Sequence, residues 1–455
     1  MKSNTNSLTE GPLAKQILLV SLPLALSNLL QVLFNMSDVA VVGRFAGSTA
    51  LGAVGSTSIF VTLFTGFLIG LSNGINVLVA RFYGARHPND VHDTVHSALI
   101  VSLIAGVILL VVGLLGSPAM LRLLNTKEDL LPGAILYLRV YFLGMPALAL
   151  YNFGNAVFSA IGETKKPLYI LSFAGVLNIL LNLFFVIVCN LDVAGVALAT
   201  IISQTVSACM VTRMLMKEEG ALHLDLHHLG FHMGALKQIL LIGLPAGLQS
   251  TVFSLSNVVI QSAVNSFGSI VVAGNSAASN LEGFVYTAMN AFAQAAVTFT
   301  SQNMGARRYD NLDRVMRNCL LCVTVVGLFL GCGAYFGGEV LLHFYSTDEA
   351  VVAAGLSRMQ IICTAYFLCG IMDTLASCLR GRGYSVLPMI VSLVGSCLLR
   401  LVWIATIFRM FRSTGTLYIS YPISWALTAG VHLICLLVVR KKMNDQLKEE
   451  SRLAA

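Results

Sequence analysis

Long apolar runs separated by short polar stretches make up most of this chain. Each run holds about 20 residues or more, the length that an α-helix needs to cross the hydrocarbon core of a bilayer. Twelve runs can be placed, at 16–40, 54–80, 93–117, 132–158, 167–189, 193–216, 236–262, 272–300, 315–341, 351–379, 385–410 and 415–439. The pattern predicts an all-α integral membrane protein with twelve transmembrane helices.

The second half of the chain repeats landmarks of the first half in nearly constant register. Lys15-Gln16-Ile17-Leu18-Leu19 returns as Lys237-Gln238-Ile239-Leu240-Leu241, and Pro23 returns as Pro245, with an offset of 222 (237 − 15). Gly84-Ala85-Arg86 returns as Gly305-Ala306-Arg307, and Gly162 with Pro167 returns as Gly383 with Pro388, with an offset of 221 (305 − 84). The chain is therefore internally duplicated, which in an apolar chain is typical of a transporter whose pathway lies between the halves.

The duplication also predicts how the chain is divided. Six helices per half give an N-lobe at 1–217, a linker at 218–235, a C-lobe at 236–440 and a tail at 441–455. Because six is an even number, both repeats enter the membrane from the same side. We therefore expect two six-helix bundles related by a pseudo-two-fold axis along the membrane normal.

Composition agrees with a membrane protein, and charge predicts its orientation. Hydrophobic residues make up 56% of the chain and charged residues 11%, against about 25% charged in a soluble domain. If the N-terminus is cytoplasmic, few basic residues fall in outer segments, namely Arg44, Arg122, Lys127, Arg409 and Arg412. Basic loops stay on the cytoplasmic side. We therefore expect a membrane protein with both termini in the cytoplasm. The net charge of +7 reflects this bias, and because the chain has no basic tract of the nucleic-acid type, we expect no nucleic-acid partner.

Polar residues at membrane depth are the candidates for function, because a charge there is costly. In the first span, the spacing i, i+3, i+7, i+10 places four of them on one helical stripe: Asn28, Gln31, Asn35 and Asp38. The counterpart in the second half has no acid and consists of Ser250, Phe253, Asn257 and Ile260. The two lobes are therefore chemically unequal.

The fifth and sixth spans add polar residues to the N-lobe. Asn178 and Asn182 are four residues apart and so lie on one helical face, and Thr200 lies in the sixth span. A single Asn in a membrane helix most often bonds a neighbouring helix. Two of them facing an acid-bearing helix favour a site instead.

The second half has its own buried charges, for which two interpretations stay open. Glu282 and Asp373 lie in the eighth and tenth spans, and Arg400 lies in the middle of the eleventh. Either Arg400 neutralises one of the acids as a structural pair, or these residues form a substrate or proton site. We include them, together with Asn152 and the stripe residues Gln31, Asn35 and Asn257, among the candidates for lining a substrate cavity.

Three further motifs have simpler explanations. Gly70-Leu71-Ser72-Asn73-Gly74 matches the serine hydrolase elbow, but that motif requires a strand-to-helix turn. Within a span, Gly66, Gly70 and Gly74 instead predict a small-residue stripe for close helix packing. Most of the ten Cys lie in apolar spans and behave as small hydrophobic residues. The linker carries His223, His227, His228 and His232, for which metal binding is an alternative to the favoured solvated amphipathic segment.

Several motifs in this order resemble the multidrug and toxic compound extrusion (MATE) family, most nearly its bacterial DinF-like branch. They are the run from Asn35 to Arg44, the Gly84-Ala85-Arg86 and Gln302 to Arg307 turns, Gly162-Glu163-Thr164-Lys165-Lys166-Pro167, and Leu379-Arg380-Gly381-Arg382-Gly383. The resemblance runs from about Leu8 to Lys442. It implies a V-shaped pair of six-helix bundles in the bacterial inner membrane that exports organic, often cationic, compounds in exchange for protons or sodium ions.

The resemblance also implies roles for residues of the N-lobe. Asp38, Asn178 and Thr200 match the family's cation or proton site, whereas Asn182 stands where many relatives have Asp. Loss of that second carboxylate favours protons over sodium and leaves Asp38 as the coupling residue. Burial disfavours a charged carboxylate, so Asp38 can take up a proton from outside and release it inside. Pro23 and Pro245 lack a backbone N–H and are the expected hinges.

Other function classes remain as alternatives. Sodium-coupled drug export is one, and flipping of a lipid-linked saccharide by a relative of the same superfamily is another. The latter usually needs a more basic cavity than Arg139, Arg358 and Arg400 provide. A membrane enzyme would need a nucleophile with a base, or a metal motif, on facing helices. The sequence has none, so we expect no enzymatic activity and no cofactor, only small-molecule substrates and membrane lipid as partners of a monomer.

Overall fold

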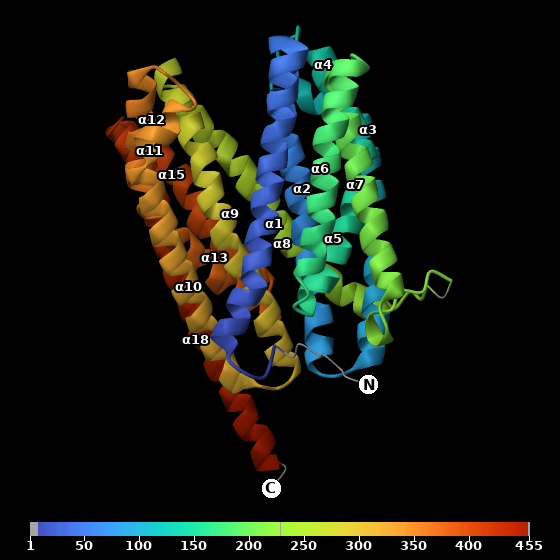
Figure 1. Cartoon of the computed structure of the whole chain (residues 1–455). Coiled ribbons are helices and arrows are strands. Elements are labelled where there is room, and N and C mark those ends of the chain that lie inside the picture. Colours follow the sequence, from blue (N-terminus) through green and yellow to red (C-terminus); the bar gives the residue numbers. More distant parts are fainter. Residues whose placement is uncertain (1–7, 228, 454–455) are drawn as a thin grey trace. The chain divides into compact units, whose positions relative to one another are not determined.

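The computed structural model describes residues 8–227 and 229–453, and within these ranges every regular element is a helix (Figure 1). The chain packs into two compact units. Unit 1 runs to Ser254 and includes Ser301–Tyr309, and unit 2 contains Leu255–Thr300 and the chain from Asp310 on. The division into lobes at 1–217 and 236–440 stays a prediction based on the repeat.

Unit 1 is a bundle of long helices joined by short loops. Its elements are α1 (Leu13–Val41), η1 (Val42–Ala46), α2 (Gly47–Gly84), α3 (Pro88–Leu123), α4 (Leu131–Leu143), α5 (Met145–Ala160), α6 (Lys165–Leu183), η2 (Phe184–Val188), α7 (Asp192–Lys217), η3 (Gly220–Leu222) and the first part of α8 (Met233–Asn265). In Figure 1, α1 in blue lies beside α6 in green, and α6 contacts α7. These three helices carry the polar residues singled out above.

Unit 2 contains the rest of α8 and the remaining helices. They are α9 (Ser269–Gly305, whose last turn belongs to unit 1), α10 (Tyr309–Phe336), α11 (Gly338–His343), α12 (Glu349–Ile362), α13 (Phe367–Gly381), α14 (Val386–Ser392), η4 (Leu393–Leu398), α15 (Leu399–Ala405), α16 (Ile407–Met410), α17 (Thr414–Tyr418) and α18 (Ser420–Leu453). Helices α13 and α18 pack along each other.

Eight helices of the described chain are long and apolar enough to cross a membrane, or up to ten if each of two bent pairs counts as one span. The longest candidate, Leu13–Gly84, contains both α1 and α2. The bent pairs are α4 with α5, at 47°, and α12 with α13, at 46°, and they replace the straight spans predicted at 132–158 and 351–379. Pro146 at the start of α5 explains the first bend, because a proline ring clashes with the preceding helical turn.

Glycines allow α2 and α8 to approach closely in unit 1. A Cβ on Gly70 would lie 2.4 Å from the Cα of Gly247, and one on Gly74 would lie 2.4 Å from the carbonyl oxygen of Ile239. Gly66 meets Ser250 in the same row. The predicted small-residue stripe is therefore confirmed as a packing surface, and the hydrolase-like motif within it is helical.

A second close contact joins the end of α2 to the last turn of α9. A Cβ on Gly84 would lie 2.1 Å from the carbonyl oxygen of Gln302, and one on Gly305 would lie 1.8 Å from that of Arg81. The segment before α1 crosses this contact, because the Leu8 N–H donates to Gln302 Oε1 at 3.3 Å and the Leu8 carbonyl accepts from Asn303 Nδ2 at 3.2 Å. Leu8 is buried, so this segment is anchored by packing as well as by hydrogen bonds.

Candidate functional site

Helix packing determines where Asp38 lies. Phe34 of α1 packs against Gly175 of α6 so closely that a Cβ on that glycine would overlap the Phe34 ring. Asp38 follows Phe34 by one helical turn, and Asn182 follows Gly175 by two turns, so the two side chains meet. Each lies just before a π-helical segment, η1 and η2 respectively, and these segments contact each other. Such segments are frequent at functional sites.

The structure brings together Asp38, Asn178, Asn182 and Thr200. The Asn182 amide donates to Asp38 Oδ1 and, at 3.1 Å, to Asn178 Oδ1. Asn178 Nδ2 lies 3.5 Å from Thr200 Oγ1, which lies 3.5 Å from Asp38 Oδ2. Asp38 is 9% exposed and Asn182 is fully buried. We refer to these four residues as the Asp38 cluster.

The Thr200 hydroxyl can donate only one hydrogen bond within the Asp38 cluster. Thr200 has one hydroxyl hydrogen, and its Oγ1 lies closer to the carbonyl oxygen of Val196, at 3.0 Å, than to Asp38. A threonine hydroxyl that bonds the preceding turn has no second hydrogen for the carboxylate. While that hydrogen points at Val196, Asp38 Oδ2 bonds Thr200 as a protonated donor, and when it turns to Asp38, the hydroxyl donates to the charged carboxylate. The cluster can therefore accommodate a proton on Oδ2.

No cationic side chain forms an ion pair with Asp38 within the described parts of the chain. The nearby wall is aromatic, because Tyr137 and Tyr141 stack at 6.1 Å and lie within the electrostatic field of Asp38. Asn182 Oδ1 is buried without a hydrogen-bond partner. A buried carboxylate with only neutral partners needs a proton or a bound cation to balance its charge.

The acid of unit 2 at Glu282 has a different environment. Arg358 Nε and Nη2 donate to its two oxygens at 2.8 and 2.7 Å, and Arg358 Nη1 donates to Asn275 Oδ1 at 2.7 Å. Glu282 and Arg358 are 4% and 6% exposed. The interpretation that Arg400 neutralises Glu282 is therefore wrong, because Arg358 occupies both carboxylate oxygens. The spacing of Asn275 and Glu282, i and i+7 on α9, was the available signal for a shared face.

Arg400 and Asp373 have polar partners of their own, but Arg400 shares the Tyr421 ring with Arg358, whose guanidinium carbon lies 5.5 Å from the ring centroid. Arg400 Nε donates to Ser424 Oγ at 2.8 Å, and its guanidinium carbon lies 4.3 Å from the Tyr421 ring centroid. Asp373 bonds the Tyr286 hydroxyl and lies in the field of Arg380. Arg400 thus stacks on aromatic rings.

The other candidates are spread over the molecule. Gln31, Asn35 and Asn257 are exposed, so of the first-span stripe only Asp38 is buried. Asn152 is buried and donates to the carbonyl oxygen of Leu148 at 2.9 Å, within its own helix. Pro23 and Pro245 both lie inside helices, α1 and α8. Their roles as hinges stay a prediction.

The linker between α7 and α8 combines exposed histidines with buried leucines, in line with the solvated amphipathic segment expected from its sequence. Leu222 and Leu224 are 7% and 0% exposed and join an apolar cluster with α2, α3 and α5. His232 contacts α3, and His223 Nδ1 lies 3.1 Å from the Glu218 carbonyl oxygen. His228 lies outside the described residues. Within the residues that the structure does describe, no three His, Cys, Asp or Glu side chains are grouped to hold a metal ion.

Comparison with known proteins gives the same duplication that the sequence indicated. The profile of the MatE family matches twice, at residues 23–184 and 245–406, an offset of 222 (245 − 23). The chain is 28% identical over 406 residues to the probable multidrug resistance protein YpnP of Bacillus subtilis, covering 86% of this chain and 88% of that protein. It is 23% identical to a protein of Shewanella oneidensis named FAD transporter, over 87% and 88% of the two chains.

A solved structure shares the fold. It is an outward-facing multidrug resistance MATE family transporter of the MOP superfamily, with a TM-score of 0.90 and 21% identity over 98% of this chain and all of that chain. These likenesses confirm the all-helical membrane fold, the expected family and a transporter rather than an enzyme. The two matches of the family profile together cover more than half of the chain, and the chain therefore belongs to the MatE family of multidrug efflux transporters.

Proposed function

We propose that this protein is a secondary active antiporter that exports organic, often cationic, compounds in exchange for protons by alternating access. Asp38 is the coupling residue in this proposal, with Asn178, Asn182 and Thr200 as its positioning partners. The observation that carries the proposal is the environment of Asp38, a buried carboxylate with amide and hydroxyl partners. Its charge is balanced by a proton or a cation that can bind and dissociate, and transport can be coupled to that binding.

The neutral partners suit proton exchange. Asn182 bonds one carboxylate oxygen through an N–H in both charge states, so the site keeps its geometry when Asp38 is neutral. The other oxygen faces Thr200, whose hydroxyl can accept from a protonated Asp38 or donate to a charged one. A change of charge at Asp38 therefore alters the bonding between α1 and α7. Pro23 in α1 is where this change is expected to bend the helix.

Sodium is the second candidate for the coupling ion, because Asn182 Oδ1 is a buried oxygen without a hydrogen-bond partner. Together with Asp38 it offers two oxygens to a cation. We favour the proton because the Asp38 cluster holds one carboxylate, which a single proton neutralises without requiring further oxygen ligands. The experiment below separates the two ions.

The test is efflux of a fluorescent cationic drug from proteoliposomes under an imposed pH gradient, and then under an imposed sodium gradient. We expect the pH gradient alone to drive export, and Asp38→Asn to abolish it while the protein stays folded and inserted. Asn has nearly the shape of Asp, so packing is kept and titration is lost. The control is Glu10→Gln, at an exposed acid outside the Asp38 cluster, which should leave export intact. Export driven by sodium alone, or normal export by Asp38→Asn, would contradict the proposal.

The proposed orientation places both termini and the linker in the cytoplasm, following the distribution of basic residues. A Gly220→Cys variant tests it, because Gly220 is an exposed linker residue. An impermeant thiol reagent should label this cysteine in opened membranes and leave it unlabelled in intact cells. Labelling in intact cells would reverse the orientation.

A further inference from the structure

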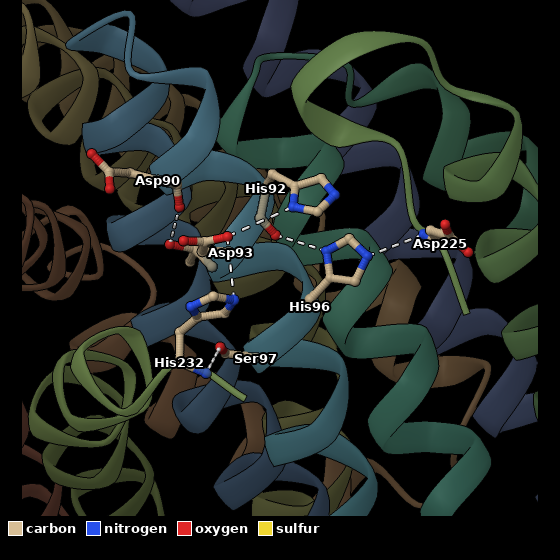
Figure 2. Close-up of polar contacts among 8 residues, drawn as sticks. Asp90, His92, Asp93, His96, Ser97, Asp225 and His232 are labelled. Carbon is tan, nitrogen blue, oxygen red and sulfur yellow. Dashed lines mark hydrogen bonds and ion pairs between the residues drawn. The ribbon is translucent and has the colours of Figure 1, made fainter. Parts of the chain in front are cut away.

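The linker between α7 and α8 is attached to the start of α3 by hydrogen bonds that use its backbone. Figure 2 shows the two attachment points, where Asp225 N–H donates to His96 Nε2 at 3.1 Å and His232 N–H donates to Ser97 Oγ at 3.2 Å. His96 and Ser97 are 1% and 0% exposed. A buried imidazole thus serves as the acceptor for one end of a docked segment.

The bonds of His96 define its protonation state. Its Nδ1 lies 2.8 Å from the His92 carbonyl oxygen, which can only accept, so Nδ1 carries the hydrogen. Its Nε2 accepts from the Asp225 N–H and therefore carries none. The docked linker requires a neutral His96. A second proton on Nε2 would set one N–H against another and remove the bond.

We propose that His96 is a pH-sensitive latch that holds linker residues 222–227 on α3 and releases them when it is protonated. Binding of a proton at Nε2 and docking of the Asp225 N–H exclude each other, so each weakens the other by linkage. Histidine is the side chain that ordinarily changes charge near physiological pH. The latch is separate from the Asp38 cluster and does not depend on the proposed coupling ion.

The charged groups around His96 determine how the latch responds. On α3, the His92 ring lies 4.1 Å from the His96 ring, and Asp93 lies 3.7 Å from His92 Nδ1. On the linker side, His232 Nε2 lies 3.3 Å from the same Asp93 oxygen (Figure 2). Asp93 is therefore the acidic neighbour shared by His92 and His232, and His92 is the titratable side chain in ring contact with His96.

The remaining neighbours are mostly apolar or already paired. Asp225 Oδ1 accepts from the His227 N–H at 2.9 Å, and Asp90 Oδ2 lies 3.0 Å from His87. The helices α2 and α5 meet this part of α3 through an apolar cluster whose titratable members are Tyr83 and Tyr151. Arg81 is the basic residue in the last turn of α2.

Release would change the connection between the two repeats. The linker joins α7 to α8, and its docked part is held by Leu222 and Leu224 as well as by His96. Freeing six residues adds up to about 20 Å of reach to the chain. A released linker therefore restrains α8 less than a docked one does. Low pH on the side of the membrane where the linker lies would then loosen the connection between α7 and α8.

The test is hydrogen–deuterium exchange of segment 222–227 in the full-length protein in lipid nanodiscs, corrected for the chemical exchange rate. Between about pH 8 and about pH 5.5, we expect exchange in the wild type to rise at least tenfold. His96→Gln keeps an acceptor for the Asp225 N–H and cannot titrate, so its corrected exchange should change less than about twofold. His96→Ala should exchange fast at both pH values.

Controls assign the response to His96. His87→Gln, at an exposed histidine outside the contact, and Asp38→Asn should both behave as the wild type, the latter even if the proposed coupling role of Asp38 is wrong. His232→Gln should keep the pH response, because it leaves His96 in place. Wild-type exchange that is independent of pH, or a His96→Gln response equal to that of the wild type, would overturn the latch. A response lost in His232→Gln and kept in His96→Gln would also overturn it and would assign the switch to the His232–Asp93 pair.

Discussion

Two carboxylates, Asp38 in unit 1 and Glu282 in unit 2, are buried to a similar degree but have opposite partners. They are 9% and 4% exposed. Asp38 contacts an amide and a hydroxyl, whereas both oxygens of Glu282 are bonded by the Arg358 guanidinium. A carboxylate paired with a guanidinium in this geometry is neutralised, whereas a carboxylate with neutral partners keeps its charge. The partner set, rather than burial, therefore distinguishes the acid that we propose to couple transport from the acid held in an ion pair.

The largest effect on stability is expected from breaking the Glu282–Arg358 ion pair. Arg358→Ala leaves Glu282 and Asn275 without their donors, and we expect it to lower the free energy of unfolding by about 3–5 kcal/mol. Asp38→Asn should change it by less than about 1 kcal/mol, since it removes a charge that had no cationic partner. Denaturation followed by tryptophan fluorescence measures both.

A double variant serves as the control for that prediction. Arg358→Met with Glu282→Leu removes both charges and keeps the volume, so it should recover most of the loss. If Arg358→Ala were as stable as the wild type, or the double variant no better than the single one, Glu282 would not be a structural acid and a role in substrate binding would be favoured.

The next largest effect is expected from adding a second carboxylate to the Asp38 cluster. Asn182→Asp places a second carboxylate against Asp38, and two neighbouring charges favour uptake of a proton or a cation. We expect efflux to become dependent on sodium, and sodium to raise stability over choline by about 2–3 kcal/mol when its concentration is about 100 times its dissociation constant. Asn152→Asp, at another buried amide, is the matched control and should show no sodium effect. Sodium-independent efflux by Asn182→Asp would mean that the second carboxylate does not share a site with Asp38.

A smaller effect is expected at Thr200, which bonds only one of the two Asp38 oxygens. Thr200→Val removes the hydroxyl at nearly constant volume, and the loss of one hydrogen bond of about 1 kcal/mol should slow efflux about fivefold. Thr200→Ser keeps the hydroxyl and should remain close to the wild-type rate. Equal rates for the two variants would place Thr200 outside the coupling site.

The smallest effect is expected from an exposed acid. Glu10 Oε1 lies 3.8 Å from Arg86 and 3.5 Å from Arg308, and its side chain is 57% exposed. Glu10→Gln should change the free energy of unfolding by less than about 0.5 kcal/mol, because solvent screens both pairs. A cost near that of Arg358→Ala would show that burial is not what gives the Glu282 pair its strength.

The sequence was sufficient for the features that depend on local spacing. Asn178 and Asn182, four residues apart on one helix, do share a face that is turned to α1, where Asn182 bonds both Asp38 and Asn178. The small-residue stripe on α2 also follows from spacing alone. The repeat was readable because the duplication preserves its register to within one residue, with offsets of 222 and 221.

Features that depend on packing between helices could not be predicted in the same way. Arg358 rather than Arg400 pairs with Glu282, and Arg400 lies two residues after the π-helical segment η4, which shifts the faces expected from a regular α-helical period. The docking of the linker depends on Leu224 and His96, which are 128 residues apart (224 − 96). The sequence favoured a solvated amphipathic segment there, and only the fold reveals the buried acceptor on α3.

The contact between the ends of α2 and α9 has a consequence for the history of the chain. Gly84 meets Gln302 and Gly305 meets Arg81, and with the repeat offset of 221 each residue of the first pair corresponds to one of the second (84 + 221 = 305; 81 + 221 = 302). The contact is therefore isologous, the kind that two copies of one module make across a dimer interface. A substitution at either glycine displaces the backbone of the other repeat, so the two copies constrain each other's sequence at this point long after their fusion into one chain.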